Sequence, residues 1–154
     1  PKMQVDGQIT GAGQLTLSGG ATQSNADWEL NNAANDFAGG LVIDRNINPS
    51  GNYRNDVTVN AAGALSTGDV TVLGGKLVTA TAGSLDSPSA IDIVGGTLEL
   101  GSTETAQFSL QAGALLKISG GSTTLDYEPT TGNVQIFNNA VLDKTSIIDA
   151  AFSP

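Results

Sequence analysis

A short repeating unit constrains this sequence more than any other feature. In each unit an apolar residue, any residue and a second apolar residue are followed by a Gly-rich corner and then by Leu. This alternation is typical of a β-strand, because successive side chains point to opposite faces. Glycine adopts positive φ without steric cost, so the chain can turn sharply after each strand. The copies of the unit are residues 57–65, 70–77, 78–85, 91–98, 108–115 and, in degenerate form, 134–142.

The spacing of these copies indicates that they stack on one another. Val57 lies 21 residues before Val78, and Val70 lies 21 residues before Ile91. A strand of three or four residues is unstable alone, but it can hydrogen-bond to the same strand of the periods before and after it. Parallel strands joined in this way are expected to coil right-handed. The sequence therefore predicts an all-β right-handed parallel β-helix (a single-stranded β-solenoid) of about seven periods and roughly 35 Å in length.

We expect one domain over residues 1–154, with core repeats at about 9–142. Strands are also expected at 15–17, 28–30 and 41–43, where apolar residues alternate. Residues 44–56 are polar and turn-rich, so they are predicted to form a loop extruded from the solenoid. Leu77 ends one unit and Val78 starts the next. Strict alternation cannot bury both, so a corner or bulge is expected between them.

Several of these motifs resemble a known bacterial repeat. Residues 11–19 and the endings Gly63-Ala64-Leu65, Gly75-Lys76-Leu77 and Gly96-Thr97-Leu98 resemble the autotransporter-associated β-strand repeat. The resemblance covers most of residues 9–142. It implies a passenger-type right-handed β-helix displayed outside the bacterial cell, in a family whose members often serve as adhesins or spacers. The motif is short and degenerate, so it is specific for architecture and weak for activity.

Composition excludes several classes of function. The net charge is −9 and the six Lys and Arg residues are scattered, so no phosphate-binding stripe can form and no nucleic-acid partner is expected. No run of about 18 apolar residues marks a membrane span. The chain has no His and no Cys. This absence rules out Ser-His-Asp and Cys-His nucleophilic sites and most zinc sites, so we expect neither an enzyme nor a cofactor.

Carboxylates in the strands leave one enzymatic alternative open. Asp92, Glu99 and Asp126 stand at alternate positions of expected strands, where we expect them to point outward and to share one face. Two carboxyl groups about 5–9.5 Å apart can hydrolyse a glycosidic bond, which would make the chain a carbohydrate-active β-helix enzyme. The simpler interpretation is a solvated outer face that keeps the solenoid soluble and resists edge pairing.

The expected loop carries the other candidate residues. Asp44, Asn46 and Asn48 place side-chain oxygen atoms at every second position, as the ligands of calcium loops are placed. However, Pro49 replaces the usual Gly and no Glu stands at the twelfth position. The loop is either a polar loop held by Asx turns or a calcium site. A calcium site would make the chain a calcium-stabilised glycan-binding module, which is the second alternative function. The loop residues that could contact a partner are Tyr53, Arg45 and Arg54.

The function expected from the sequence is that of a non-catalytic structural module, secreted or on a bacterial cell surface. It would act as a stalk, an adhesin segment or a filament subunit. Asn31-Asn32 and Asn138-Asn139 are expected to stack as polar ladders at corners. Solenoids normally need caps, and no strong cap is visible at either end. Self-association through the ends, stacking on neighbouring repeats of a longer chain, or contact with a host or glycan surface is therefore expected.

Overall fold

The computed structural model is built from strands and turns. It describes residues 2–18, 26–44, 55–102, 104, 108–110, 114–118, 122–123, 126–127, 133–136, 141–142 and 147–148. These residues include no helix, and therefore none long and apolar enough to cross a bilayer. The all-β prediction is confirmed.

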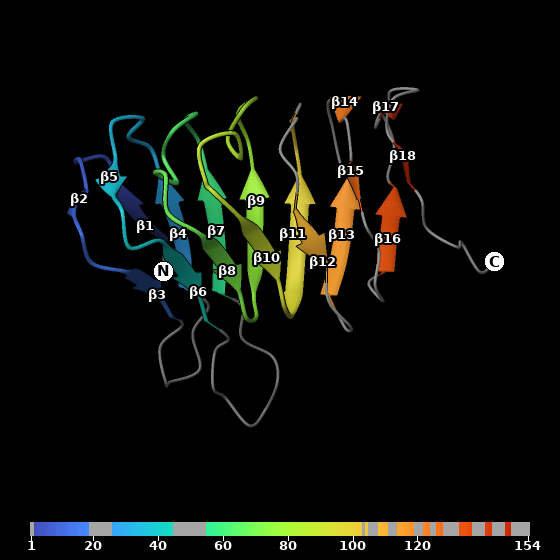
Figure 1. Ribbon diagram of the computed structural model, residues 1–154, viewed down its shortest axis with the longest axis horizontal. Coiled ribbons are helices and arrows are strands. Elements are labelled where there is room, and N and C mark those ends of the chain that lie inside the picture. Colours follow the sequence, from blue (N-terminus) through green and yellow to red (C-terminus); the bar gives the residue numbers. More distant parts are fainter. Residues whose placement is uncertain are drawn as a thin grey trace.

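Two parallel sheets extend along the length of the molecule, on different sides of the coils (Figure 1). The seven-stranded sheet contains, in spatial order, β1 (Lys2–Val5), β4 (Ala26–Leu30), β7 (Asn55–Val59), β9 (Lys76–Thr79), β11 (Gly96–Leu100), β13 (Ala114–Ile118) and β16 (Asn133–Ile136). The five-stranded sheet contains β3 (Leu15–Leu17), β6 (Leu41–Ile43), β8 (Val70–Val72), β10 (Ile91–Ile93) and β12 (Ser109–Leu110). Three parallel two-strand pairs are β2 (Thr10–Gly11) with β5 (Asp36–Phe37), β14 (Ser122–Thr123) with β17 (Val141–Leu142), and β15 (Asp126–Tyr127) with β18 (Ile147–Ile148).

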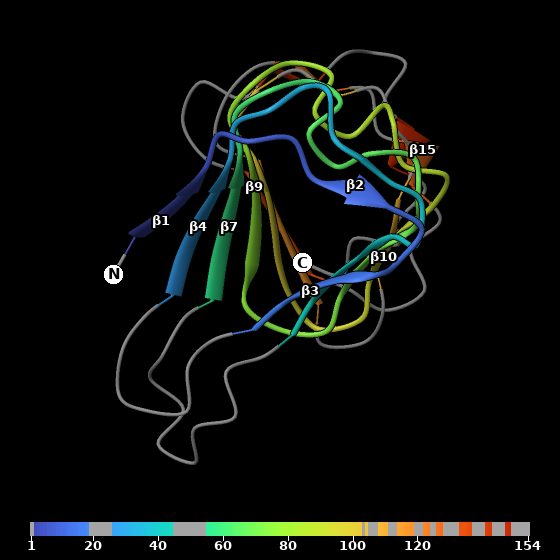
Figure 2. The same ribbon diagram turned by 90° about the vertical axis from the view of Figure 1, so that its left-hand side faces the viewer.

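The chain passes from one sheet to the other and back in each coil. β7 is followed by β8 and β9 by β10, and each strand pairs in parallel with its counterpart in the next coil. Figure 2 shows successive coils following one another around a common centre. The predicted parallel β-solenoid is confirmed.

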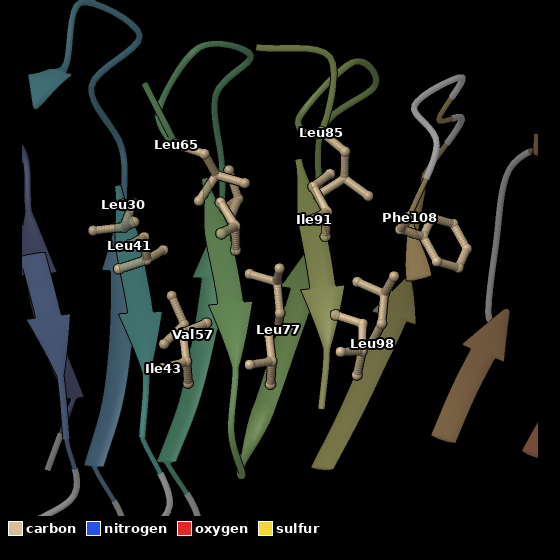
Figure 3. Close-up of a cluster of buried hydrophobic side chains, with 14 of the residues drawn as sticks. Leu30, Leu41, Ile43, Val57, Leu65, Leu77, Leu85, Ile91, Leu98 and Phe108 are labelled. Carbon is tan, nitrogen blue, oxygen red and sulfur yellow. The ribbon is translucent and has the colours of Figure 1, made fainter. Parts of the chain in front are cut away.

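The core lies between the two sheets as rows of stacked apolar side chains (Figure 3). One row of the seven-stranded sheet joins Val57, Leu77, Leu98 and Leu116, and all four side chains are buried. The facing sheet contributes its own buried rows, formed by Leu41, Val70 and Ile91 and by Ile43, Val72 and Ile93. Full burial of such a side chain stabilises the fold by about 1.5–3 kcal/mol. Each coil therefore depends on its neighbours for most of its stability.

The register of β9 differs from the sequence prediction. Val57 pairs with Leu77 and not with Val78, so β7 and β9 are offset by 20 residues, whereas β9 and β11 are offset by 21. The strand continues through Leu77, which is buried, to Val78, which is half-buried. The corner or bulge expected between these two residues is absent, because the chain turns earlier, at Gly75 with φ +78°.

The ends of the predicted loop and core also need correction. Asn55 and Asp56, assigned above to the extruded loop 44–56, belong to β7, while residues 45–54 lie outside the described part of the chain. Asn55 is buried and its amide donates to the carbonyls of Leu17 at 2.8 Å and Asp44 at 2.9 Å. The Asn55 side chain therefore connects β7 to the two preceding coils. The stacked strands also begin before residue 9, at Lys2.

Candidate functional site

The outer face of the seven-stranded sheet carries a shallow hollow, which we call the charged groove. It encloses about 350 Å³. The groove crosses β7, β9, β11 and β13, and therefore lies along the solenoid axis. Its lining residues are Asp56, Gly75, Lys76, Thr97, Glu99, Leu115 and Lys117.

Strand register brings the four charges of the groove together. Asp56 pairs directly with Lys76 across β7 and β9, and Glu99 pairs with Lys117 across β11 and β13. The Lys76 Nζ lies 3.5 Å from Asp56 Oδ2 and 3.2 Å from Glu99 Oε2. The Lys117 Nζ donates to Glu99 Oε1 at 2.8 Å. Opposite charges thus alternate along the groove, an arrangement that stabilises neighbouring strands.

The lysines determine the ionisation of Glu99. Partial burial of this carboxyl opposes ionisation, but the hydrogen bonds from Lys117 and Lys76 outweigh it and lower the pKa of Glu99. Glu99 is therefore ionised at neutral pH and holds no proton for general acid catalysis. The second carboxylate of the groove, Asp56, has one buried oxygen, Oδ1, without a hydrogen-bond partner among the described residues. The groove can accept polar groups, and its charges mainly neutralise one another.

The three carboxylates considered as a glycosidase set do not share a face. Asp92 lies on β10 of the five-stranded sheet, and Glu99 lies on β11 of the seven-stranded sheet. Asp126 belongs to β15, in a separate pair with β18. The expectation of one shared face is wrong, because each coil distributes its strands over different sides of the solenoid.

The polar ladder predicted at Asn31-Asn32 is confirmed. The Asn31 amide donates to Asp6 Oδ1 at 2.6 Å, and the Asn60 amide donates to Asn31 Oδ1 at 2.8 Å. Asn32 donates to the Asp6 carbonyl at 2.9 Å. These bonds connect three successive coils at one corner. Asn138-Asn139 lie outside the described residues.

The structure describes only one residue of the calcium candidate. The Asp44 backbone N–H donates to the Leu17 carbonyl at 3.0 Å, which continues the pairing of β6 with β3. Within the described part of the chain, no group of three acidic, His or Cys residues could hold a metal ion. The remaining candidates, Asn46 and Asn48 for calcium and Arg45, Tyr53 and Arg54 for partner contact, lie outside the described residues.

Sequence reasoning missed a buried carboxyl, Glu104, which is only 1% exposed. Its Oε2 accepts from the Leu85 N–H at 3.0 Å and its Oε1 from the Ser102 hydroxyl at 3.3 Å. Burial raises the pKa of Glu104, and these hydrogen bonds oppose that effect only in part. Asn35 acts similarly in an earlier coil, where its Oδ1 accepts from the Ile9 N–H at 2.9 Å. Because the corners vary in length, no fixed spacing in the sequence marks these positions.

Comparisons of this chain with protein-family models, with curated proteins and with solved structures found no match, so the resemblance to the autotransporter-associated repeat stays a prediction.

Proposed function

We propose that this chain is a non-catalytic structural module of a bacterial surface or secreted protein, acting as a stalk, an adhesin segment or a filament subunit. The observation that carries the proposal is the continuous core, in which each coil buries the apolar side chains of the next. Such a core makes a stiff rod whose length increases with each added coil. The function of the rod is therefore geometric, because it sets the distance between whatever is attached to its two ends.

The outer surface supports a structural role over a catalytic one. Glu99 is bonded to two lysines, and Glu29 forms an ion pair with Lys2, whose hydrogen bond lowers the pKa of Glu29. These carboxylates pair with cations across strands and remain ionised. A glycosidase would need two facing carboxyls, one of them protonated, whereas Asp92 and Glu99 lie on different sheets.

The bacterial surface location rests on the resemblance described above and on composition. A chain without Cys can be exported unfolded without forming disulfides on the way. Its modest acidic charge keeps a repetitive β protein soluble. Protease accessibility on intact cells of the source organism tests this location, because a surface module is digested without lysis and an internal protein is protected.

The proposed role is tested by electron microscopy and an activity assay on the same purified protein. We expect rods of uniform width and no release of reducing ends from bacterial or plant polysaccharides. Globular particles would contradict the structural role, and release of reducing ends would establish the carbohydrate-active alternative. A melting temperature that falls on chelation would instead support the calcium-stabilised glycan-binding alternative.

Contact with a host or glycan surface is proposed for Arg45, Tyr53 and Arg54. Replacement of all three by Ala should abolish adhesion to the target surface while the melting temperature stays unchanged. The matched control is Lys76→Ala, which removes a cation of the charged groove instead. Equal adhesion of the triple variant and the wild type would show that these residues make no functional contact.

A further inference from the structure

The charges of the groove are shared unevenly between its two ends. At β7, Asp56 stands directly beside Asp27 of β4 in the parallel register. Like charges in this position repel each other. The Lys76 ammonium lies 3.5 Å from Asp56 Oδ2, and Asp56 Oδ1 has no hydrogen-bond partner within the described part of the chain. This end of the groove therefore has an excess of negative charge.

The other end of the groove, at β13, has the reverse balance. Lys76 and Lys117 both contact one carboxylate, that of Glu99, at 3.2 and 2.8 Å. The next position in this row, Gln135 on β16, is uncharged. The Lys117 side chain is 30% exposed, more than that of any other charged residue lining the groove. The groove is therefore an electric dipole along the solenoid axis, negative at β7 and positive at β13.

We propose that two copies of the chain pair through this face, around a twofold axis that lies in the contact plane and passes between β9 and β11. The axis reverses the order of the strands, so β13 lies opposite the partner's β7, and β11 opposite the partner's β9 (Figure 1). Lys117 of each copy then faces the partner's Asp56, and Glu99 faces the partner's Lys76. Both copies use the same residues, as in any twofold contact. This inference rests on the proposed structural function and deepens it by making the partner a second rod.

The order of the charges favours a second copy as the partner. From β7 to β13 the signs are negative, positive, negative and positive, and the reversed order is complementary at every position. Two such dipoles placed side by side in opposite directions attract each other. An ammonium has three N–H donors and a carboxylate accepts several hydrogen bonds, so the contacts within each copy can persist. A partner with charges of one sign would leave half of these groups facing a like charge.

The strand register also identifies the centre of the contact. On a lattice of strands about 4.8 Å apart and residues about 3.3 Å apart, Val78 and Thr97 lie about 1 Å from the axis that exchanges Asp56 with Lys117. Each of these two half-buried residues therefore faces its own counterpart in the partner. The four strands span only about 19 Å. Because the contact is smaller than a standard interface of about 1,600 Å², we expect weak pairing that salt weakens further.

Charge reversal at the two ends of the groove tests the pairing. Lys117→Glu places a carboxylate opposite the partner's Asp56, and Asp56→Lys places an ammonium opposite the partner's Lys117. Each variant alone should self-associate at least about tenfold more weakly than the wild type in sedimentation equilibrium at low salt. A mixture of the two variants should form a heterodimer about as strong as the wild-type dimer, because each of these lysines then faces a carboxylate.

The matched control is Asp92→Lys, which makes the same change of charge on the five-stranded sheet. We expect this variant to self-associate like the wild type. Fluorescently labelled Lys117→Glu should bind Asp56→Lys at least about tenfold more tightly than it binds Asp92→Lys, although these two partners have the same net charge. Circular dichroism should show that all three variants are folded.

A crosslinking experiment tests the position of the axis without a change of charge. The chain has no Cys, so a single Cys can be introduced. Facing sheets pack about 10 Å apart, a distance that a short bismaleimide spans. Val78→Cys should therefore give a crosslinked dimer. The matched control is Thr58→Cys, at the position paired with Val78 on β7. Its two copies would be offset by a further 10 Å or so within the contact plane, about two strand spacings, and should crosslink poorly.

Three results would overturn the inference: wild-type monomers at every concentration at low salt, no tighter heterodimer in the mixture of charge-reversed variants, or equal crosslinking at positions 58 and 78. Rod-shaped monomers without enzymatic activity would refute the twofold contact and leave the structural role intact. Release of reducing ends by paired rods would instead refute the non-catalytic role and leave the contact intact. Failure of the inference and failure of the proposed function are therefore distinguishable.

Discussion

Truncation of Leu77 to Ala tests the stacked core directly. The Leu77 side chain is 0% exposed and lies in one inward row between Val57 and Leu98. Removal of three carbons at about 0.8 kcal/mol each loses about 2.4 kcal/mol of transfer free energy. The cavity adds to this loss, because hydrogen bonds on both sides hold β9 in place and limit collapse. We expect the free energy of unfolding to fall by about 3–5 kcal/mol.

The control for this experiment is Val78→Ala on the same strand. Val78 is half-buried on the opposite face, so its truncation should cost about 1 kcal/mol or less. Both variants are measured by urea unfolding, followed by circular dichroism and by the fluorescence of Trp28, the single tryptophan. If the slope of the free energy of unfolding against urea concentration is the same in the variants and the wild type, all of them expose the same surface area on unfolding. A larger loss for Val78→Ala than for Leu77→Ala would refute the register and support a strand that starts at Val78.

Two further variants test the corners. Gly96 has φ +82° and a Cβ there would lie 2.4 Å from the Gly75 carbonyl oxygen, so Gly96→Ala should lower the free energy of unfolding by about 1–3 kcal/mol. Gly7→Ala, with no atom near the added carbon, should be nearly neutral, and equal urea midpoints for the two variants would contradict this account. Because the pKa of Glu104 is raised by burial, its contribution to stability is present below the ordinary value of 4.5 and is lost as pH rises through the folded-state pKa. Glu104→Gln should therefore flatten the decline of melting temperature above pH 4.5, and an unchanged pH profile would show that Glu104 is not responsible.

The sequence alone predicted the architecture because strand alternation and corner glycines are local signals. The 21-residue spacing between Val70 and Ile91 is the pairing found between β8 and β10. The same reasoning failed at β9, where Leu77 and Val78 are both apolar and the alternation is ambiguous. Only the position of the turn at Gly75 decides which of the two enters the core.

The candidate site shows where the sequence stops being informative. The composition alone shows that the chain has few charged residues and neither His nor Cys. This composition narrowed the kinds of catalytic and metal site that the chain could form. The convergence of Asp56, Lys76 and Glu99 on one groove could not be predicted from the sequence. It depends on the offset between coils and on which sheet each strand joins. These offsets follow from corner lengths, which differ from coil to coil. The sequence thus determined that coils form and stack, while the tertiary register decided which side chains meet, since one residue of slip exchanges the inner and outer faces of a strand.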